Sequence, residues 1–213
     1  MANTRRTVAI AKQLLGLVPD FGQSDDLFID LGPGHLGSEA WVCREMRPDC
    51  RIIGLEPSPS RFDNLAPTYP GELLSRAISD HSGIVAGFIG KPVYPAPLSD
   101  FKLVVEDTDN HIRKYNATDM TCSSVDSLVE EFGPVRKVVV WADIEGSELA
   151  MLNGATRSLG DGTIVAVNLE LLGLRGWYNP AEPKEVLNQS GFSSEAKIGH
   201  DFLFIRNAEQ GGV

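Results

Sequence analysis

The sequence has little cysteine, no long hydrophobic run and no excess of positive charge. Its three cysteines form no Cys-x-x-Cys pair, so buried, reduced thiols in an intracellular setting are expected. No apolar run approaches the roughly 18 to 20 residues that a membrane span needs. The formal net charge of −10 disfavours nucleic acid as the main partner, because phosphate binding needs clustered Lys and Arg. We therefore expect a cytoplasmic protein that binds neither nucleic acid nor membrane.

What remains is an ordinary globular composition in 213 residues, enough for one domain with a sizeable core. Residues 1–25 are interpreted as an N-terminal helical segment, 26–206 as the domain and 207–213 as a tail. Apolar residues in 8–18 are spaced like one face of a helix, and no acid precedes Asp20. An amphipathic helix packed against the domain is the favoured interpretation, and a transit peptide is the alternative.

Strand-like and helix-like segments alternate along the domain, which predicts an α/β fold: a mostly parallel sheet with helices on both faces. Strands are predicted at 27–31, 51–55, 72–78, 137–142 and 163–169, with two closing strands at 192–197 and 202–205. Helices are predicted at 38–46, 60–65, 124–132, 147–159 and 181–189. Residues 82–120 are interpreted as an inserted hairpin, with strands near 84–89 and 101–105, plus a loop on the ligand side.

A glycine-rich turn follows the first predicted strand. Gly32, Gly34 and Gly37 fit the spacing G-x-G-x-x-G, which lets a backbone pass close to a nucleotide-type ligand. A second apolar run ends in Glu56, and an acid there can accept hydrogen bonds from both hydroxyls of an unphosphorylated ribose. Together these features predict a site for an adenosine-bearing cofactor.

Asp30, two residues before the first glycine, bears on which cofactor binds. A carboxylate there would repel a pyrophosphate and attract a cationic ligand. S-adenosylmethionine carries a sulfonium and an ammonium group and no phosphate, so a methyltransferase turn is the favoured interpretation. An NAD-dependent oxidoreductase, or a cofactor-binding module without catalysis, is the alternative.

Acids recur at the predicted carboxyl ends of the strands, where ligands of open parallel sheets bind. They are Asp30, Glu56, Asp80, Asp143 with Glu145, and Glu170. Such a rim suits a cationic cofactor and offers candidates for a general base.

Several motifs then resemble the FkbM-type methyltransferases. The segment 143–148 (D-I-E-G-S-E) with 152–155 (L-N-G-A) resembles that family's D-V-E-G-x-E…L-x-G-A signature. Four further segments resemble parts of the same family pattern: 56–59 its E-P-x-P, 77–83 its A-x-S-D-x-x-G, 125–128 its L-D-S-L and 202–206 its terminal strand. The resemblance implies a Rossmann-like class I methyltransferase fold with a seven-stranded sheet, an antiparallel closing strand, and S-adenosylmethionine-dependent methylation, usually of a hydroxyl oxygen. The acceptor expected is a small molecule or glycan with a hydroxyl.

Two departures from the family pattern stand out. Pro33-Gly34 replaces its more common first turn, and Trp141-Ala142 stand where a hydrophobic residue and a lysine usually precede D-V-E-G. A role of that lysine is therefore absent from this chain.

For the cofactor, Gly32 and Gly34 are expected to let the backbone approach the methionine moiety. Asp30 either fixes the turn or pairs with the ammonium group, directly or through water. Glu56 is expected to hold the ribose hydroxyls, and Ser79 and Asp80 to lie near the adenine edge.

For the acceptor, Asp143 is expected where the hydroxyl and the methyl group meet. Methyl transfer to an alcohol needs positioning and a base. The candidates for the base are Asp143, Glu145, His35 and Glu170. Asp143 with Asn168 and Glu170 could instead hold a divalent metal, although a site without metal is favoured. Trp141, Trp177 and Tyr178 could line the acceptor pocket, with burial in the core the favoured interpretation for Trp141.

Overall fold

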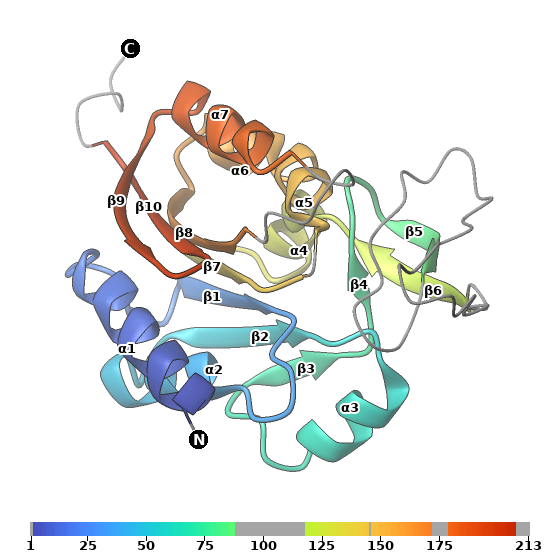
Figure 1. The fold of residues 1–213 in the computed structure, drawn as a ribbon. Coiled ribbons are helices and arrows are strands. Elements are labelled where there is room, and N and C mark those ends of the chain that lie inside the picture. Colours follow the sequence, from blue (N-terminus) through green and yellow to red (C-terminus); the bar gives the residue numbers. More distant parts are fainter. Residues whose placement is uncertain (1, 88–117, 145, 172–178, 208–213) are drawn as a thin grey trace, which may run out of the picture.

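The protein folds around one seven-stranded sheet (Figure 1). The computed structural model describes residues 2–87, 118–144, 146–171 and 179–207. The strands of this sheet are β1 (Asp26–Leu31), β2 (Arg51–Leu55), β3 (Glu72–Leu74), β7 (Lys137–Ala142), β8 (Ile164–Glu170), β9 (Phe192–Ile198) and β10 (Asp201–Arg206). Their order is β3-β2-β1-β7-β8-β10-β9. β10 runs antiparallel to β8 and β9, and the pairs among β3, β2, β1, β7 and β8 are parallel.

The order of the strands reverses between β1 and β7. The chain moves outward from β1 through β2 to β3 and later returns to place β7 on the other side of β1. The loops that follow β1 and β7 begin beside each other at the carboxyl edge of the sheet and lead to helices on opposite faces. Ligands of open parallel sheets bind at such a reversal.

Helices cover both faces of the sheet. α1 (Ala2–Gly16) and α2 (Ser38–Met46) lie on one face, and α4 (Val125–Glu131), α5 (Glu148–Asn153), α6 (Thr156–Gly160) and α7 (Ala181–Gln189) lie on the other (Figure 1). α3 (Pro59–Leu65) lies beside β3 at one side of the sheet. Side chains along β1 point alternately to the two faces of the sheet and so contribute to the core on each face. Leu27, Ile29 and Leu31 pack on one face and Phe28 packs on the other.

The N-terminal segment forms the predicted amphipathic helix. Ile10, Leu14 and Leu15 on α1 are at most 1% exposed and join the core that also holds Phe28 of β1. Burying three such side chains contributes about 5 to 9 kcal/mol before the entropy of ordering the helix is subtracted. Among the described residues, no helix combines the length and the apolar character that would let it cross a membrane.

The prediction of a single strand over 72–78 is wrong. The segment leaves the main sheet after β3, and β4 (Ala77–Ile78) pairs instead with β6 (Thr118–Ser123). β6 also pairs antiparallel with β5 (Gly83–Gly87), which completes a second, three-stranded sheet. The strand β5 of this antiparallel pair lies where the inserted hairpin was expected, whereas β6 begins at the end of the stretch interpreted as loop and continues past residue 120. The strand predicted at 101–105 lies outside the described residues.

The prediction of one helix over 147–159 is also wrong, because the helix breaks into α5 and α6 at Gly154 and Ala155. A Cβ on Gly154 would lie 2.4 Å from the carbonyl oxygen of Ser79. Asp126 accepts hydrogen bonds from the main-chain N–H groups of Arg157 and Ser158, so it supports the start of α6. The break thus brings the chain close to the segment that follows β4.

Candidate functional site

The glycine turn and the loop after β7 touch at the carboxyl edge of the main sheet. Gly32 has φ +76, and a Cβ there would lie 2.1 Å from the carbonyl oxygen of Asp143. The main-chain nitrogen of Asp143 donates to Leu31 at 3.0 Å, and that of Gly32 donates to Leu55 at 3.1 Å. Three strand ends therefore converge at one point, and glycine at position 32 permits the approach.

The turn leaves open space where a ligand backbone contact was predicted. Gly34 has φ +64, and among the described residues a Cβ there would meet only the carbonyl oxygen of Gly32, 4.0 Å away. Gly37, with φ +51, precedes α2, and its main-chain nitrogen donates to Pro33 at 3.0 Å. The turn is held at both ends and open at Gly34, which fits a cofactor placed against its backbone.

Asp30 lies beneath this turn rather than in the open space above it. Its side chain is fully buried, and the hydroxyl of Tyr69 donates to its Oδ2 at 2.8 Å. Burial, as the largest cause, raises the pKa of Asp30 to about 7. Glu39 on α2 lies within hydrogen-bonding reach of the same carboxyl group.

Sequence reasoning overlooked both of these partners. Glu39 shares one face of α2 with Cys43, at i and i+4, and both are buried. An acid on the apolar face of a helix is a signal that could have revealed it. Tyr69 lies in an irregular connection before β3, where no periodic pattern marks a contact across the sheet.

Glu56 follows β2 as predicted and is 2% exposed. Its Oε1 accepts a hydrogen bond from the main-chain nitrogen of Ser58 at 2.8 Å. Burial raises the pKa of Glu56, while the Ser58 N–H and the charges of Arg61 and His35 act to lower it. A carboxylate offers about four lone-pair sites, so this group retains capacity for ribose hydroxyls. The exposed His35 thus lies on the Glu56 side of the turn.

Ser79 and Asp80 follow β4 in the second sheet, not a strand of the main sheet. Ser79 is 2% exposed and its main-chain nitrogen donates to Ser123 at 3.0 Å. Asp80 is half exposed, with its Oδ1 2.6 Å from Nδ1 of His81 and 3.2 Å from Oγ of Ser79. The hydrogen bond from His81 lowers the pKa of Asp80. Gly154 packs against this pair, so the motifs at 77–83 and 152–155 meet in space.

Asp143 lies at the end of β7, partly buried, and its charge acts on Asp30. Glu145, the second candidate base, lies outside the described residues. Glu148, the last acid of the same motif, is fully buried, and its Oε1 accepts from the main-chain nitrogen of Gly146 at 3.1 Å. Glu148 therefore supports the loop that carries Asp143, a role that the sequence pattern did not reveal.

Two residues of the metal alternative, Asn168 and Glu170, act on Asp201. Asn168 is fully buried on β8 and its Nδ2 donates to Asp201 at 3.3 Å. The charge of Glu170 acts on the same Asp201, whose carboxylate also pairs with Arg6 of α1 at 2.5 Å. Within the described ranges, no group of three His, Cys, Asp or Glu side chains is arranged to hold a metal.

The aromatic residues considered for an acceptor pocket divide into two groups. Trp141 is 3% exposed within the core beneath α1 and α2, as the favoured interpretation has it. Trp177 and Tyr178 lie outside the described residues.

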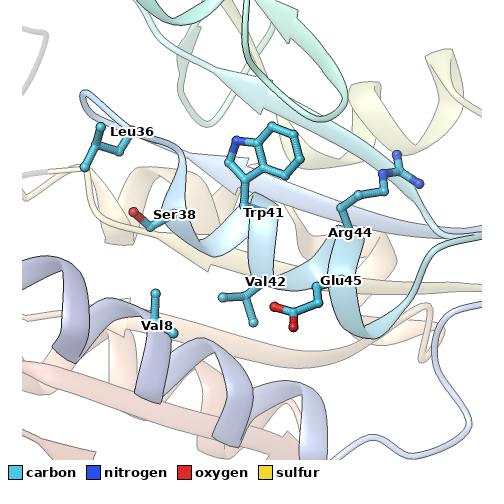
Figure 2. Close-up of a pocket in the computed structure, with 7 residues that line it drawn as sticks. All are labelled: Val8, Leu36, Ser38, Trp41, Val42, Arg44 and Glu45. Carbon is cyan, nitrogen blue, oxygen red and sulfur yellow. The ribbon is translucent and has the colours of Figure 1, made fainter.

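A separate pocket lies between α1 and α2 (Figure 2). Trp41, half exposed, and Leu36 project at its edge, with Val8 of α1 directed toward Val42. None of the predicted site residues that the structure describes lines it. The pocket is therefore distinct from the cofactor edge at Gly32, Glu56 and Asp143.

The strand order, the reversed β10 and a glycine turn followed by a strand-end acid define a Rossmann-like, class I methyltransferase. Residues 21–205 match the family model described as the methyltransferase FkbM domain. The chain therefore belongs to the FkbM methyltransferase family, whose cofactor is S-adenosylmethionine, in agreement with the resemblance seen in the sequence motifs.

Comparisons with individual proteins are more distant. The chain is 25% identical over 205 residues to the hexuronic acid methyltransferase AglP of Haloferax volcanii, covering 93% of this chain and 77% of the relative. Among solved structures, it is similar to the precorrin-6y C5,15-methyltransferase of Geobacter metallireducens, at 16% identity and a TM-score of 0.48, covering 93% and 84% of the two chains. Human N-acetylserotonin methyltransferase in complex with SAM gives 15% identity and a TM-score of 0.44, covering 96% of this chain and 51% of that chain.

Proposed function

We propose that this protein transfers a methyl group from S-adenosylmethionine to a hydroxyl oxygen of a sugar or a similar small molecule. The observation that carries the proposal is the contact between Gly32 and Asp143. It places the turn predicted for the cofactor directly beside the acid predicted for the acceptor, at the reversal of the sheet. Neither the glycine turn nor Asp143 alone would make a transferase site.

The chain's residues divide the work as follows. When bound, S-adenosylmethionine supplies a methyl group activated by its sulfonium sulfur. Glu56 accepts hydrogen bonds from the ribose hydroxyls, and the backbone at Gly32 and Gly34 borders the methionine moiety. Asp30 contributes negative charge from beneath the turn, and Ser79 with Asp80 borders the adenine.

Asp143 orients the acceptor hydroxyl and takes its proton. With S-adenosylmethionine bound, the hydroxyl oxygen would bond to the methyl carbon as the carbon–sulfur bond breaks, and the electron pair of that bond would stay on sulfur. The proton passes to the carboxylate of Asp143, so charge and atoms balance. Glu145, His35 and Glu170 are the other candidate bases. The position of His35 near Glu56 supports a place on the cofactor side.

A sugar-like acceptor is supported by the name of the relative AglP, a hexuronic acid methyltransferase. The proposal extends to this chain only the class of acceptor that the name gives, a sugar or a similar small molecule. At 25% identity, the particular sugar is for experiment to identify.

Two measurements test the proposal. Calorimetric titration should give binding of S-adenosylmethionine and S-adenosylhomocysteine and none of NAD or NADP. A methyl-release assay that measures S-adenosylhomocysteine should then give turnover with members of a panel of uronic acids, neutral sugars and hydroxylated metabolites. Binding of NAD alone would refute the cofactor. Turnover confined to the uronic acids, with none on neutral sugars or hydroxylated metabolites, would point to the carboxyl oxygen and would refute hydroxyl methylation.

A further inference from the structure

Three buried side chains meet beneath the glycine turn. Asp30, Glu39 and Tyr69 are 0%, 4% and 9% exposed, and they come from β1, α2 and the connection before β3. Tyr69 touches both ends of the turn. Its hydroxyl donates to Asp30 at 2.8 Å, and its ring lies 3.0 Å from where a Cβ of Gly37 would be.

A glycine in β2 makes this contact possible. Gly54 pairs with Asp30 in the sheet, and a Cβ on Gly54 would lie 2.5 Å from the hydroxyl oxygen of Tyr69. The absence of a side chain at position 54 therefore opens the path by which Tyr69 reaches across β2 to Asp30.

The hydrogen bonds around Asp30 are incomplete if both acids are ionised. Tyr69 donates to Oδ2, but Oδ1 of Asp30 is buried and has no donor among the described residues. Glu39 lies within hydrogen-bonding reach, yet an ionised carboxylate only accepts. A protonated Glu39 would supply a second donor to this carboxylate. A buried acceptor left unpaired costs about 1 to 3 kcal/mol.

The charges around the pair favour the same state. Among the described residues, the groups that act on the pKa of Asp30 are Tyr69, Glu39, Asp143 and Glu56, and the thiol of Cys43 faces it from α2. None of these is a cation. Burial, followed by the charge of Asp30, raises the pKa of Glu39 well above its usual range. Two negative charges in this place would be disfavoured by desolvation and by mutual repulsion.

We propose that Glu39 is a positioning residue that stays protonated at neutral pH, so that Asp30, Glu39 and Tyr69 present one negative charge beneath the cofactor turn. Tyr69 and Glu39 each donate a hydrogen bond to Asp30 and fix its carboxylate against the turn. The consequence for S-adenosylmethionine, a cationic ligand, rests on the proposed function.

The pH dependence follows from the direction of these shifts. The pKa of Asp30 is about 7, so its charge forms between about pH 6 and 8, while Glu39 keeps its proton. Affinity for S-adenosylmethionine should therefore rise through this range. The stability changes in the opposite direction. Because the pKa of Asp30 is higher in the folded than in the unfolded protein, the folded protein binds more protons. The contribution of Asp30 protonation to the free energy of unfolding is therefore lost as pH rises through about 7.

A matched pair of variants at position 39 tests the protonation state. The amide of Glu39→Gln donates a hydrogen bond as a protonated carboxyl does, so its dissociation constant at pH 7.5 should stay within about twofold of wild type. Glu39→Leu removes the donor and should weaken binding roughly tenfold or more. If Glu39→Gln loses as much affinity as Glu39→Leu, Glu39 is ionised in the wild type and the proposal is overturned.

Tyr69→Phe provides a test that does not depend on Glu39→Leu folding. The ring stays in place and one donor to Asp30 is lost, so the pKa of Asp30 should rise. The midpoint of the affinity-against-pH curve should therefore move to higher pH, while it stays in place for Glu39→Gln. A lower melting temperature with an unmoved midpoint would mean a purely structural role and would overturn the proposal.

Infrared spectroscopy gives a readout without cofactor. A protonated-carboxyl C=O band should persist at pH 8 in the wild type and be absent from Glu39→Gln. No such difference would contradict the proposal even if the protein binds S-adenosylmethionine. Conversely, the band together with no cofactor binding by any variant would refute the proposed function and leave the protonation of Glu39 standing.

Discussion

The two loops that meet at the reversal of the sheet are supported in different ways. The loop after β1 rests on buried polar groups, with Asp30 held by Tyr69 and flanked by Glu39. The loop after β7 is held by main-chain contacts to Leu31 and by Glu148, while Asp143 is only partly buried. A rigid, buried support suits a constant ligand such as a cofactor. A more open edge suits the acceptor of the proposed reaction.

The largest expected effect comes from removing the charge on the open side. Asp143→Asn keeps the shape of the side chain but removes its basicity, so methyl transfer should slow about a hundredfold or more. The dissociation constant of S-adenosylmethionine should change much less. Steady-state turnover at saturating cofactor, together with calorimetry, separates the two effects.

The control for this variant is Asp49→Asn. Asp49 is an exposed acid before β2, at the opposite edge of the sheet, so its amide should leave turnover unchanged. If Asp143→Asn retains nearly full activity, Asp143 is not the base, and Glu145 becomes the residue to replace. If chelators abolish wild-type turnover, the metal-free assignment is wrong.

Glu56→Ala addresses the cofactor side. The loss of a charged hydrogen-bond partner to the ribose should weaken cofactor binding by about 1.5 to 3 kcal/mol. Turnover at saturating cofactor should fall far less than in Asp143→Asn. Calorimetric titration of both variants gives the comparison, and Glu56→Gln, which still accepts hydrogen bonds, should lose less affinity than Glu56→Ala. Unchanged affinity in Glu56→Ala would show that Glu56 does not hold the ribose.

The glycines of the turn distinguish packing from ligand contact. At both Gly32 and Gly34 an alanine meets the strain of positive φ, about 1 to 2 kcal/mol. Gly32→Ala should lose more stability, because its Cβ would collide with Asp143. Gly34→Ala has room in the free protein and should lose cofactor affinity by about tenfold, through strain in the turn and loss of space for the ligand. Denaturant melts and titrations of both variants check this; equal losses in both assays would contradict the assignment.

Local pattern predicted much of the main sheet. The predicted bounds of β2, β7, α2 and α7 agree with the structure, because each is a periodic segment bounded by turn residues. The errors arose from contacts between distant parts of the chain. β4 separates from β3 because it pairs with β6, which comes some forty residues later. At Gly154, between α5 and α6, the carbonyl oxygen of Ser79 lies 2.4 Å from where a Cβ of Gly154 would be. This contact joins segments that are far apart in the sequence.

The candidate site shows the same limit. The glycine turn, Glu56 and Asp143 could be placed at one edge because carboxyl ends of parallel strands meet. The burial of Asp30 and its contact with Tyr69 depend on Gly54 being open, a three-dimensional fact that no spacing encodes. For the same reason, Asp30 and Asp80 look alike in the sequence as acids after strands, although burial raises the pKa of one and His81 lowers that of the other.

The smallest expected effect is at Asp80. Its lowered folded pKa means that the ionised form stabilises the folded protein above the unfolded pKa, and that this contribution is lost as pH falls through the folded value. Because the Asp80 and His81 side chains are about half exposed, solvent screening limits the contribution to a few tenths of a kcal/mol. Asp80→Asn should therefore be slightly less stable than wild type at pH 6, with the difference vanishing near pH 2.

The same variant tests whether the second sheet shares in cofactor binding. If Asp80 borders the adenine, Asp80→Asn should weaken S-adenosylmethionine binding a few-fold, less than Glu56→Ala, because an exposed polar contact is worth less than a buried charged one. His81→Gln serves as the control, since it removes the ion pair with Asp80 but keeps the Asp80 carboxylate. Weakened binding in both variants would assign the effect to the pair. If neither variant changes affinity, the adenine is bound elsewhere, and the cofactor site is confined to the main sheet.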